Sequence, residues 1–130
     1  MAKLKFNPKD SVIVVEAKMW GNFIATARLV FDTGASLVII PRKLAISLGL
    51  KIDPQKTLKT TTASKVEYVP VVTIPKISVL GQEVKNVEAL VKDLPPESGV
   101  DGLLGLSYIK NFKVTIDFQK SELELQPIHD

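Results

Sequence analysis

From position 30 the chain reads Val30-Phe31-Asp32-Thr33-Gly34-Ala35-Ser36. Asp32 directly follows an apolar run, residues 23–31, whose composition predicts a β-strand. A carboxylate at the end of a buried strand is expected to be desolvated, so a neighbouring group must pair it or share its charge. Thr33 offers a hydroxyl, and Gly34 lets backbone N–H groups approach the carboxylate. Taken alone, the tripeptide favours an Asx turn, in which Asp32 accepts a hydrogen bond within its own loop.

Strand signals dominate on both sides of this segment. Before it, residues 11–18 form a second Val/Ile-rich run, and residues 20–22 supply the turn of a predicted hairpin. After it, residues 37–40 are wholly apolar, as in a strand buried on both faces. Pro41 at the first helical position and Gly49 at the end predict a short helix between them.

The second half of the chain repeats this order of a hairpin, a short buried apolar strand and a short helix. Strands are predicted at residues 57–63, 66–73, 77–80, 84–91 and 103–104, and a helix at 106–112. Alternating apolar residues then predict two final strands around a turn at 119–121. The sequence therefore predicts an all-β fold, a closed barrel of short strands with one or two short helices.

Composition narrows the classes of function. With 130 residues, 45% hydrophobic and 24% charged, the chain fits a single domain spanning residues 1–130. The absence of cysteine excludes disulfides, thiol nucleophiles and zinc–thiolate centres, and we expect neither a metal nor a cofactor. The single histidine, His129, lies beside the C-terminus, a poor place to hold a catalytic imidazole rigidly. Acid–base chemistry is therefore expected from carboxylates, Lys or Tyr.

Charge and hydropathy also limit the partners that the sequence predicts. The net charge of +3 is small and the lysines are scattered, so we expect no nucleic-acid partner. No uncharged run approaches the ~20 residues of a membrane span, so we expect no membrane partner. The N-terminal residues lack the apolar core of a signal peptide, which predicts a cytoplasmic location.

Context changes the interpretation of Asp32. The Asp-Thr-Gly-Ala-Ser segment, the apolar strand after it and the Gly-Leu-Leu-Gly motif at residues 102–105 together resemble the retropepsin-like aspartic proteases, over nearly the whole chain. The resemblance implies a closed barrel that is half of a pepsin-type fold, an aspartic-type endopeptidase activity, and a catalytic role for Asp32. The other site residues that it implies are the active-site loop Thr33, Gly34, Ala35 and Ser36, the loop support Leu103, Leu104 and Gly105, and the flap tip Thr62, Ala63, Ser64 and Lys65.

The family's chemistry needs two carboxylates about 3 Å apart that share one proton. Because this chain holds one Asp-Thr-Gly, the resemblance implies a homodimer that brings Asp32 to its copy, with Thr33 linking the two loops. The substrate would be an extended peptide or protein segment that adds a strand between flap and floor. We expect its apolar pockets to involve Val38, Ile40 and Val71. The alternative is a non-catalytic retropepsin-like module for peptide binding or dimerisation.

Two departures from viral members point to a cellular branch of the family. Viral members follow Asp-Thr-Gly-Ala with an Asp that pairs with an Arg after the second glycine, whereas Ser36 and Leu106 stand at these places. No glycine lies between Gly49 and Gly81, so the flap tip must form without one. On the sequence, the two ends of the chain either join the dimer contact, as terminal strands do in viral relatives, or stay mobile.

Overall fold

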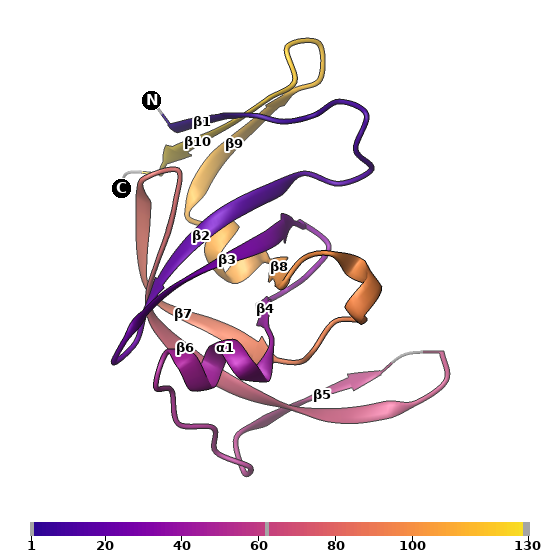
Figure 1. Ribbon diagram of the computed structural model, residues 1–130, viewed down its shortest axis with the longest axis vertical. Helices are drawn as coiled ribbons and strands as arrows, with labels where there is room; N and C mark the ends of the chain where they lie inside the picture. The colour runs from indigo at the N-terminus through magenta and orange to yellow at the C-terminus, as the bar shows by residue number, and fades with distance from the viewer. Residues whose placement is uncertain (1, 62, 129–130) are drawn as a thin grey trace.

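The computed structural model describes residues 2–61 and 63–128, and its centre is a closed β-barrel (Figure 1). Six strands form the ring, and the last of them pairs back with the first. In ring order they are β2 (Val14–Trp20), β3 (Ile24–Phe31), β8 (Gly102–Leu104), β4 (Val38–Ile40), β7 (Gln82–Val91) and β6 (Val66–Val79). The prediction of an all-β closed barrel is confirmed.

The two halves of the chain interlock through their short strands. β4 comes from the first half and pairs in parallel with β7 of the second, while β8 comes from the second half and pairs in parallel with β3 of the first. β4 and β8 then meet each other antiparallel where Ile39 pairs with Leu103. The predicted repeat of hairpin, short strand and short helix is confirmed, and this exchange places the segment after β3 beside the segment after β8.

The hairpin of β6 and β7 is longer than predicted. Residues 66–79 form one continuous strand, so the predicted break between residues 73 and 77 is wrong. Pro75 lies in the predicted break, since proline has no N–H to donate to a neighbouring strand. The register with β7 nevertheless continues on either side of it. Leu80 and Gly81 both have positive φ, 53° and 78°, which is the geometry of a tight I′ hairpin turn.

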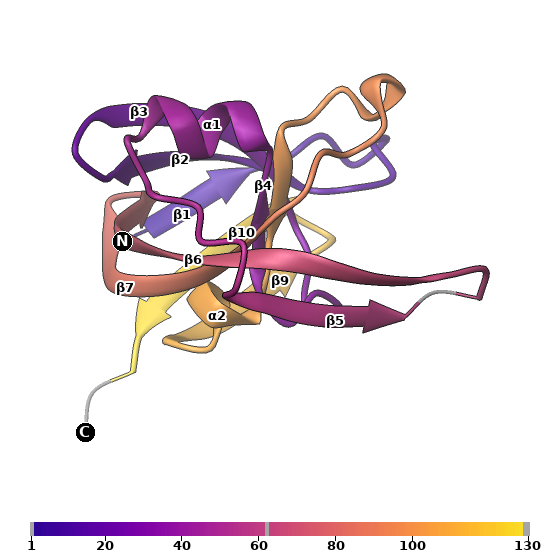
Figure 2. The same ribbon diagram turned by 90° about the horizontal axis from the view of Figure 1, so that it is seen from below.

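β5 (Thr57–Thr61) pairs only with β6, and the ribbon that they form projects well beyond the barrel (Figure 2). This ribbon has the position expected of the predicted flap. Thr62, one of the four predicted tip residues, lies outside the described residues, while Ala63, Ser64 and Lys65 are exposed.

A small second sheet joins the two ends of the chain. Its order is β1 (Ala2–Lys5), β10 (Glu122–Pro127) and β9 (Phe112–Asp117), all antiparallel. β1 is not predicted from the sequence, because four residues with two lysines carry little strand signal. The structure thus pairs the ends of the chain with each other.

The helices are short. α1 (Arg42–Ser47) begins one residue after the predicted start, with Pro41 as its N-cap, and η1 (Pro96–Ser98) is a single 3-10 turn. α2 (Leu106–Ile109) is shorter than predicted, because Phe112 already begins β9. The hydroxyl of the buried Tyr108 on α2 donates to the Gln82 carbonyl at 2.6 Å and accepts from the Val79 N–H at 3.2 Å. Burial raises the pKa of Tyr108, so the neutral hydroxyl holds α2 against the β6–β7 turn.

Candidate active site

Asp32 follows β3 directly and is held by backbone on two sides. Its N–H donates to the Leu104 carbonyl at 3.0 Å, which joins the loop to β8. Its side-chain Oδ1 accepts from the Gly34 N–H at 2.8 Å, the contact expected of an Asx turn. The residue is half-buried, and Thr33 and Gly34 are exposed, so the carboxylate is less desolvated than the sequence suggests. Within the described part of the chain, the Thr33 hydroxyl does not pair with it.

Gly105 lies against the loop that carries Asp32. A Cβ atom at this position would lie 2.3 Å from the Leu37 carbonyl oxygen and 2.8 Å from that of Ala35, so only glycine fits. The next two residues bind the same loop, because the Leu106 N–H donates to the Ala35 carbonyl at 2.8 Å and the Ser107 N–H to that of Ser36 at 3.0 Å. The structure therefore brings the segment at 103–105 to the place where it can support residues 32–36.

Ser107 is a supporting residue that sequence reasoning missed. Its Oγ donates to the Glu88 carbonyl at 2.8 Å and accepts from the Val38 N–H at 2.9 Å, so one hydroxyl joins α2, β7 and β4. Where viral members use an Asp–Arg ion pair, this chain uses backbone hydrogen bonds and this serine. The only sequence signal is a small polar residue directly after Gly105-Leu106, which says nothing about its distant partners.

The apolar surface beside the loop, called the floor below, is formed largely by other residues than those predicted to line the substrate pockets. Val38 and Ile40 are fully buried inside the barrel, so their assignment to substrate pockets is wrong. The alternate side chains, Leu37 and Ile39, face outward and pack in a separate cluster. The buried members of this cluster are Val69, Val71 and Leu90. The error arises because an unbroken apolar run has no alternation to show which face is inward.

Ion pairs connect the β5–β6 ribbon, near its tip, to the residue that follows β7. Glu67 on β6 contacts Lys65 near the flap tip at 2.5 Å and Lys92, just after β7, at 3.2 Å. Hydrogen bonds from Lys65 and then Lys92 hold the pKa of Glu67 below its ordinary value. Glu67 therefore links the β5–β6 ribbon to the end of β7 through two partly exposed ion pairs.

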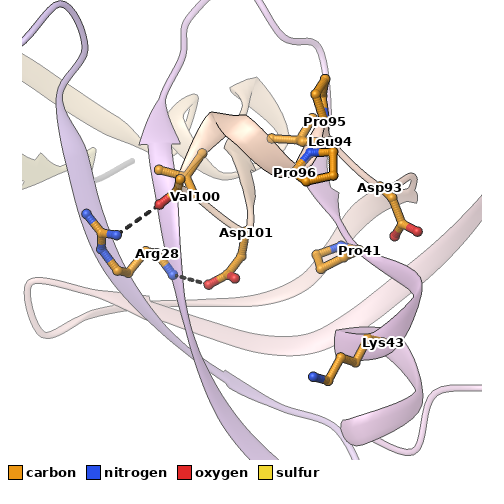
Figure 3. A pocket seen from close by; sticks show the side chains of 10 residues that line it. Arg28, Pro41, Lys43, Asp93, Leu94, Pro95, Pro96, Val100 and Asp101 are labelled. Atoms are coloured by element: carbon orange, nitrogen blue, oxygen red, sulfur yellow. Dashed lines mark hydrogen bonds between the residues drawn. The ribbon is translucent and has the colours of Figure 1, made fainter.

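A charged hollow of about 630 Å³ lies beside the floor, between β3, the start of α1 and the loop before β8 (Figure 3). Arg28 and Asp101 stand on one wall, where the Asp101 carboxylate accepts from the Arg28 backbone N–H at 2.8 Å. The Arg28 guanidinium donates to the Gly99 carbonyl at 3.0 Å. Lys43 from α1 points into the same space in Figure 3.

Residues 2–61 and 63–128 contain no group of three or more His, Cys, Asp or Glu side chains that could hold a metal ion. They also contain no helix long and apolar enough to cross a bilayer. His129 lies outside these ranges.

This structure is a closed barrel in which Asp-Thr-Gly follows β3 and Gly105, after β8, supports the Asp-Thr-Gly loop. These features define the class of retropepsin-like aspartic proteases. Residues 15–108 match the family model described as aspartyl protease, so the chain belongs to this family. The structure is similar to the crystal structure of a retropepsin-like aspartic protease from Rickettsia conorii, with a TM-score of 0.66 and 27% sequence identity. The match covers 95% of this chain and 87% of that one. Among curated proteins, none matches the sequence.

Proposed function

We propose that this chain is an aspartic endopeptidase that acts as a homodimer, with Asp32 of each protomer in a catalytic pair. The observation that carries the proposal is the state of Asp32. The residue is half-buried at the end of β3, and backbone hydrogen bonds to Leu104 and Gly34 hold its loop. A retropepsin-like protease with one such loop needs a second copy to assemble the pair.

The pair works by sharing one proton, because two carboxylates about 3 Å apart cannot both ionise. The ionised carboxyl takes a proton from a water molecule as the water oxygen attacks the scissile carbonyl carbon. The protonated carboxyl gives its proton to the carbonyl oxygen, which yields a neutral tetrahedral intermediate. The C–N bond then breaks as the leaving nitrogen takes a proton from one carboxyl, while the other carboxyl takes a proton from a hydroxyl of the intermediate, so the pair again holds one proton. The two apparent pKa values belong to the pair and not to either Asp32.

The other predicted site residues position the catalytic pair and the substrate. Thr33, Gly34, Ala35 and Ser36 shape the loop, and Leu103, Leu104 and Gly105 support it from β8. The flap residues Thr62, Ala63, Ser64 and Lys65 close over the substrate. An extended peptide fits between the flap ribbon and the outward floor, where Leu37 and Ile39 offer apolar contacts and the buried Val71 packs beneath them. A cytoplasmic location stays a prediction of the sequence.

Asp32→Asn tests this proposal, because asparagine keeps the size of the side chain and an oxygen for the Gly34 N–H. We expect the parent to dimerise and to cleave unstructured protein substrates best at acidic to mildly acidic pH, where the pair holds one proton. We expect Asp32→Asn to dimerise at least as tightly, since the repulsion within the pair is gone, and to lose hydrolysis. Peptidase activity and sedimentation equilibrium measure these two results.

Activity retained by a purified Asp32→Asn protein would contradict the proposal. The alternative of a non-catalytic module predicts a different result. In that case the parent binds extended peptides without cleaving them, and Asp32→Asn binds them equally well.

A further inference from the structure

A hollow of about 530 Å³ adjoins the catalytic loop, and both apolar side chains and polar ones, among them Asp10 and Ser11, line it. Its walls include Phe6 and Val12 from the segment between β1 and β2, and Phe118 from the turn after β9. Asp32 and Thr33 form its border. The hollow therefore joins an apolar surface directly to the residues on which the proposed chemistry depends.

The side chains around this hollow are unusually exposed for their type. Phe118 is 73% exposed and Val12 is 46% exposed. The Phe6 ring meets the Phe118 ring edge-on, with 6.0 Å between centroids, so the two aromatic residues form one surface. Contiguous exposed apolar side chains beside a site are typical of a surface that another molecule covers.

The terminal strands offer little for a contact between protomers. β10 is paired along both of its edges, with β1 on one side and β9 on the other. The Phe6 N–H continues this pairing by donating to the Ser121 carbonyl at 2.9 Å. The outer edge of β1 carries Lys3 and Lys5, and lysines on an edge strand disfavour pairing with another strand. These features of β1 and β10 favour a contact made largely by another surface.

We propose that a second copy of this chain covers this hollow, so that its apolar side chains Phe118, Val12 and Phe6 form the main contact between protomers. This inference rests on the proposed function. A pair of carboxyls that shares a proton lies about 3 Å apart, so the two-fold axis passes beside Asp32. A surface bordered by Asp32 and Thr33 then faces the partner. The contact is isologous, because each copy presents the same face to the other.

Phe118→Ser is the main test, with Phe23→Ser as its matched control. Phe23 is 65% exposed, but it lies at the β2–β3 turn and does not line the hollow. Each dimer loses two Phe118 rings, and a buried aromatic anchor typically contributes tenfold or more, so the dissociation constant should rise roughly 100-fold. Phe23→Ser should leave it unchanged. Sedimentation equilibrium gives both constants, and circular dichroism checks that each variant folds.

A second measurement uses the absence of cysteine from the chain. Val12→Cys introduces a single thiol in the hollow, and Ile46→Cys introduces one on α1, where the side chain is 62% exposed. With a maleimide probe, we expect the thiol at position 12 to react more slowly as protein concentration rises and the dimer forms. The thiol at position 46 should react at one rate throughout.

The outcomes separate this inference from the proposed function. A dimeric, active parent whose dissociation constant is unchanged by Phe118→Ser, and whose position-12 thiol stays reactive in the dimer, would overturn the inference alone. A parent that stays monomeric at high concentration would overturn the dimeric mechanism itself. Support requires that Phe118→Ser weakens the dimer and that its peptidase activity returns at high protein concentration, because its catalytic residues are intact.

Discussion

Gly105→Ala should damage the support of the catalytic loop by a clash of backbone with side chain. Gly105 has φ −96° and ψ −173°, a conformation that any residue can adopt, so conformational strain is not the reason. The new methyl group would instead lie 2.3 Å from the Leu37 carbonyl oxygen. To reach even 3.0 Å, the two backbones must separate by about 0.7 Å.

That separation acts on the neighbouring hydrogen bonds. The bonds from Leu106 N–H to Ala35 and from Ser107 N–H to Ser36 measure 2.8 and 3.0 Å, so a shift of this size stretches the first to the limit of a hydrogen bond and the second beyond it. Two lost hydrogen bonds cost about 0.5–1.5 kcal/mol each, and overpacking costs about 1–3 kcal/mol. The free energy of unfolding should fall by about 2–6 kcal/mol, a large part of the 5–15 kcal/mol typical of a domain.

Urea unfolding of Gly105→Ala beside Gly81→Ala measures this effect. Gly81 has φ +78°, and a methyl group at this position would have no other atom within 4 Å, so alanine there costs only the left-handed conformation, about 1–2 kcal/mol. Gly105→Val should lower the free energy of unfolding further than Gly105→Ala does. Folding or dimerisation should be damaged more than the chemistry itself. If Gly105→Ala is no less stable than Gly81→Ala, the contact between this glycine and the loop does not have the role assigned to it.

Two further predictions concern the support and the flap. Ser107→Ala leaves the N–H of the buried Val38 without its acceptor and should cost about 1–3 kcal/mol in urea unfolding, whereas Ser98→Ala, in an exposed loop, should cost almost nothing; equal costs would exclude the serine bridge as a source of stability. Because its ion pairs lower the pKa of Glu67, the stabilisation that they provide is present at neutral pH and is lost as pH falls through that lowered pKa. Amide protection in β5 and β6 should therefore drop at acidic pH in the parent, and Glu67→Gln should start low and show no such drop; a parent flap insensitive to pH would exclude the ion pairs as its fastening.

Local features of the sequence were enough to predict the barrel. The hairpin turns at Gly21 and Gly81 and the apolar strand before Asp32 depend on patterns of a few residues. The candidate site needed two motifs, because Asp-Thr-Gly alone favours an Asx turn and gains its catalytic interpretation only together with the Gly-Leu-Leu-Gly motif at residues 102–105. The order of elements in each half could therefore be predicted, because β-strands, turns and helix ends depend on short-range patterns.

Contacts between distant residues were decided only by the tertiary structure. Val38 and Ile40 face inward and Leu37 and Ile39 face the floor because β4 lies between β7 and β8, and an unbroken apolar run cannot record that choice. β1 exists because β10 offers it an edge, not because four residues with two lysines favour a strand. Ser107 matters through partners in β4 and β7. In each case the free energy comes from groups far apart in the chain, which local propensity does not contain.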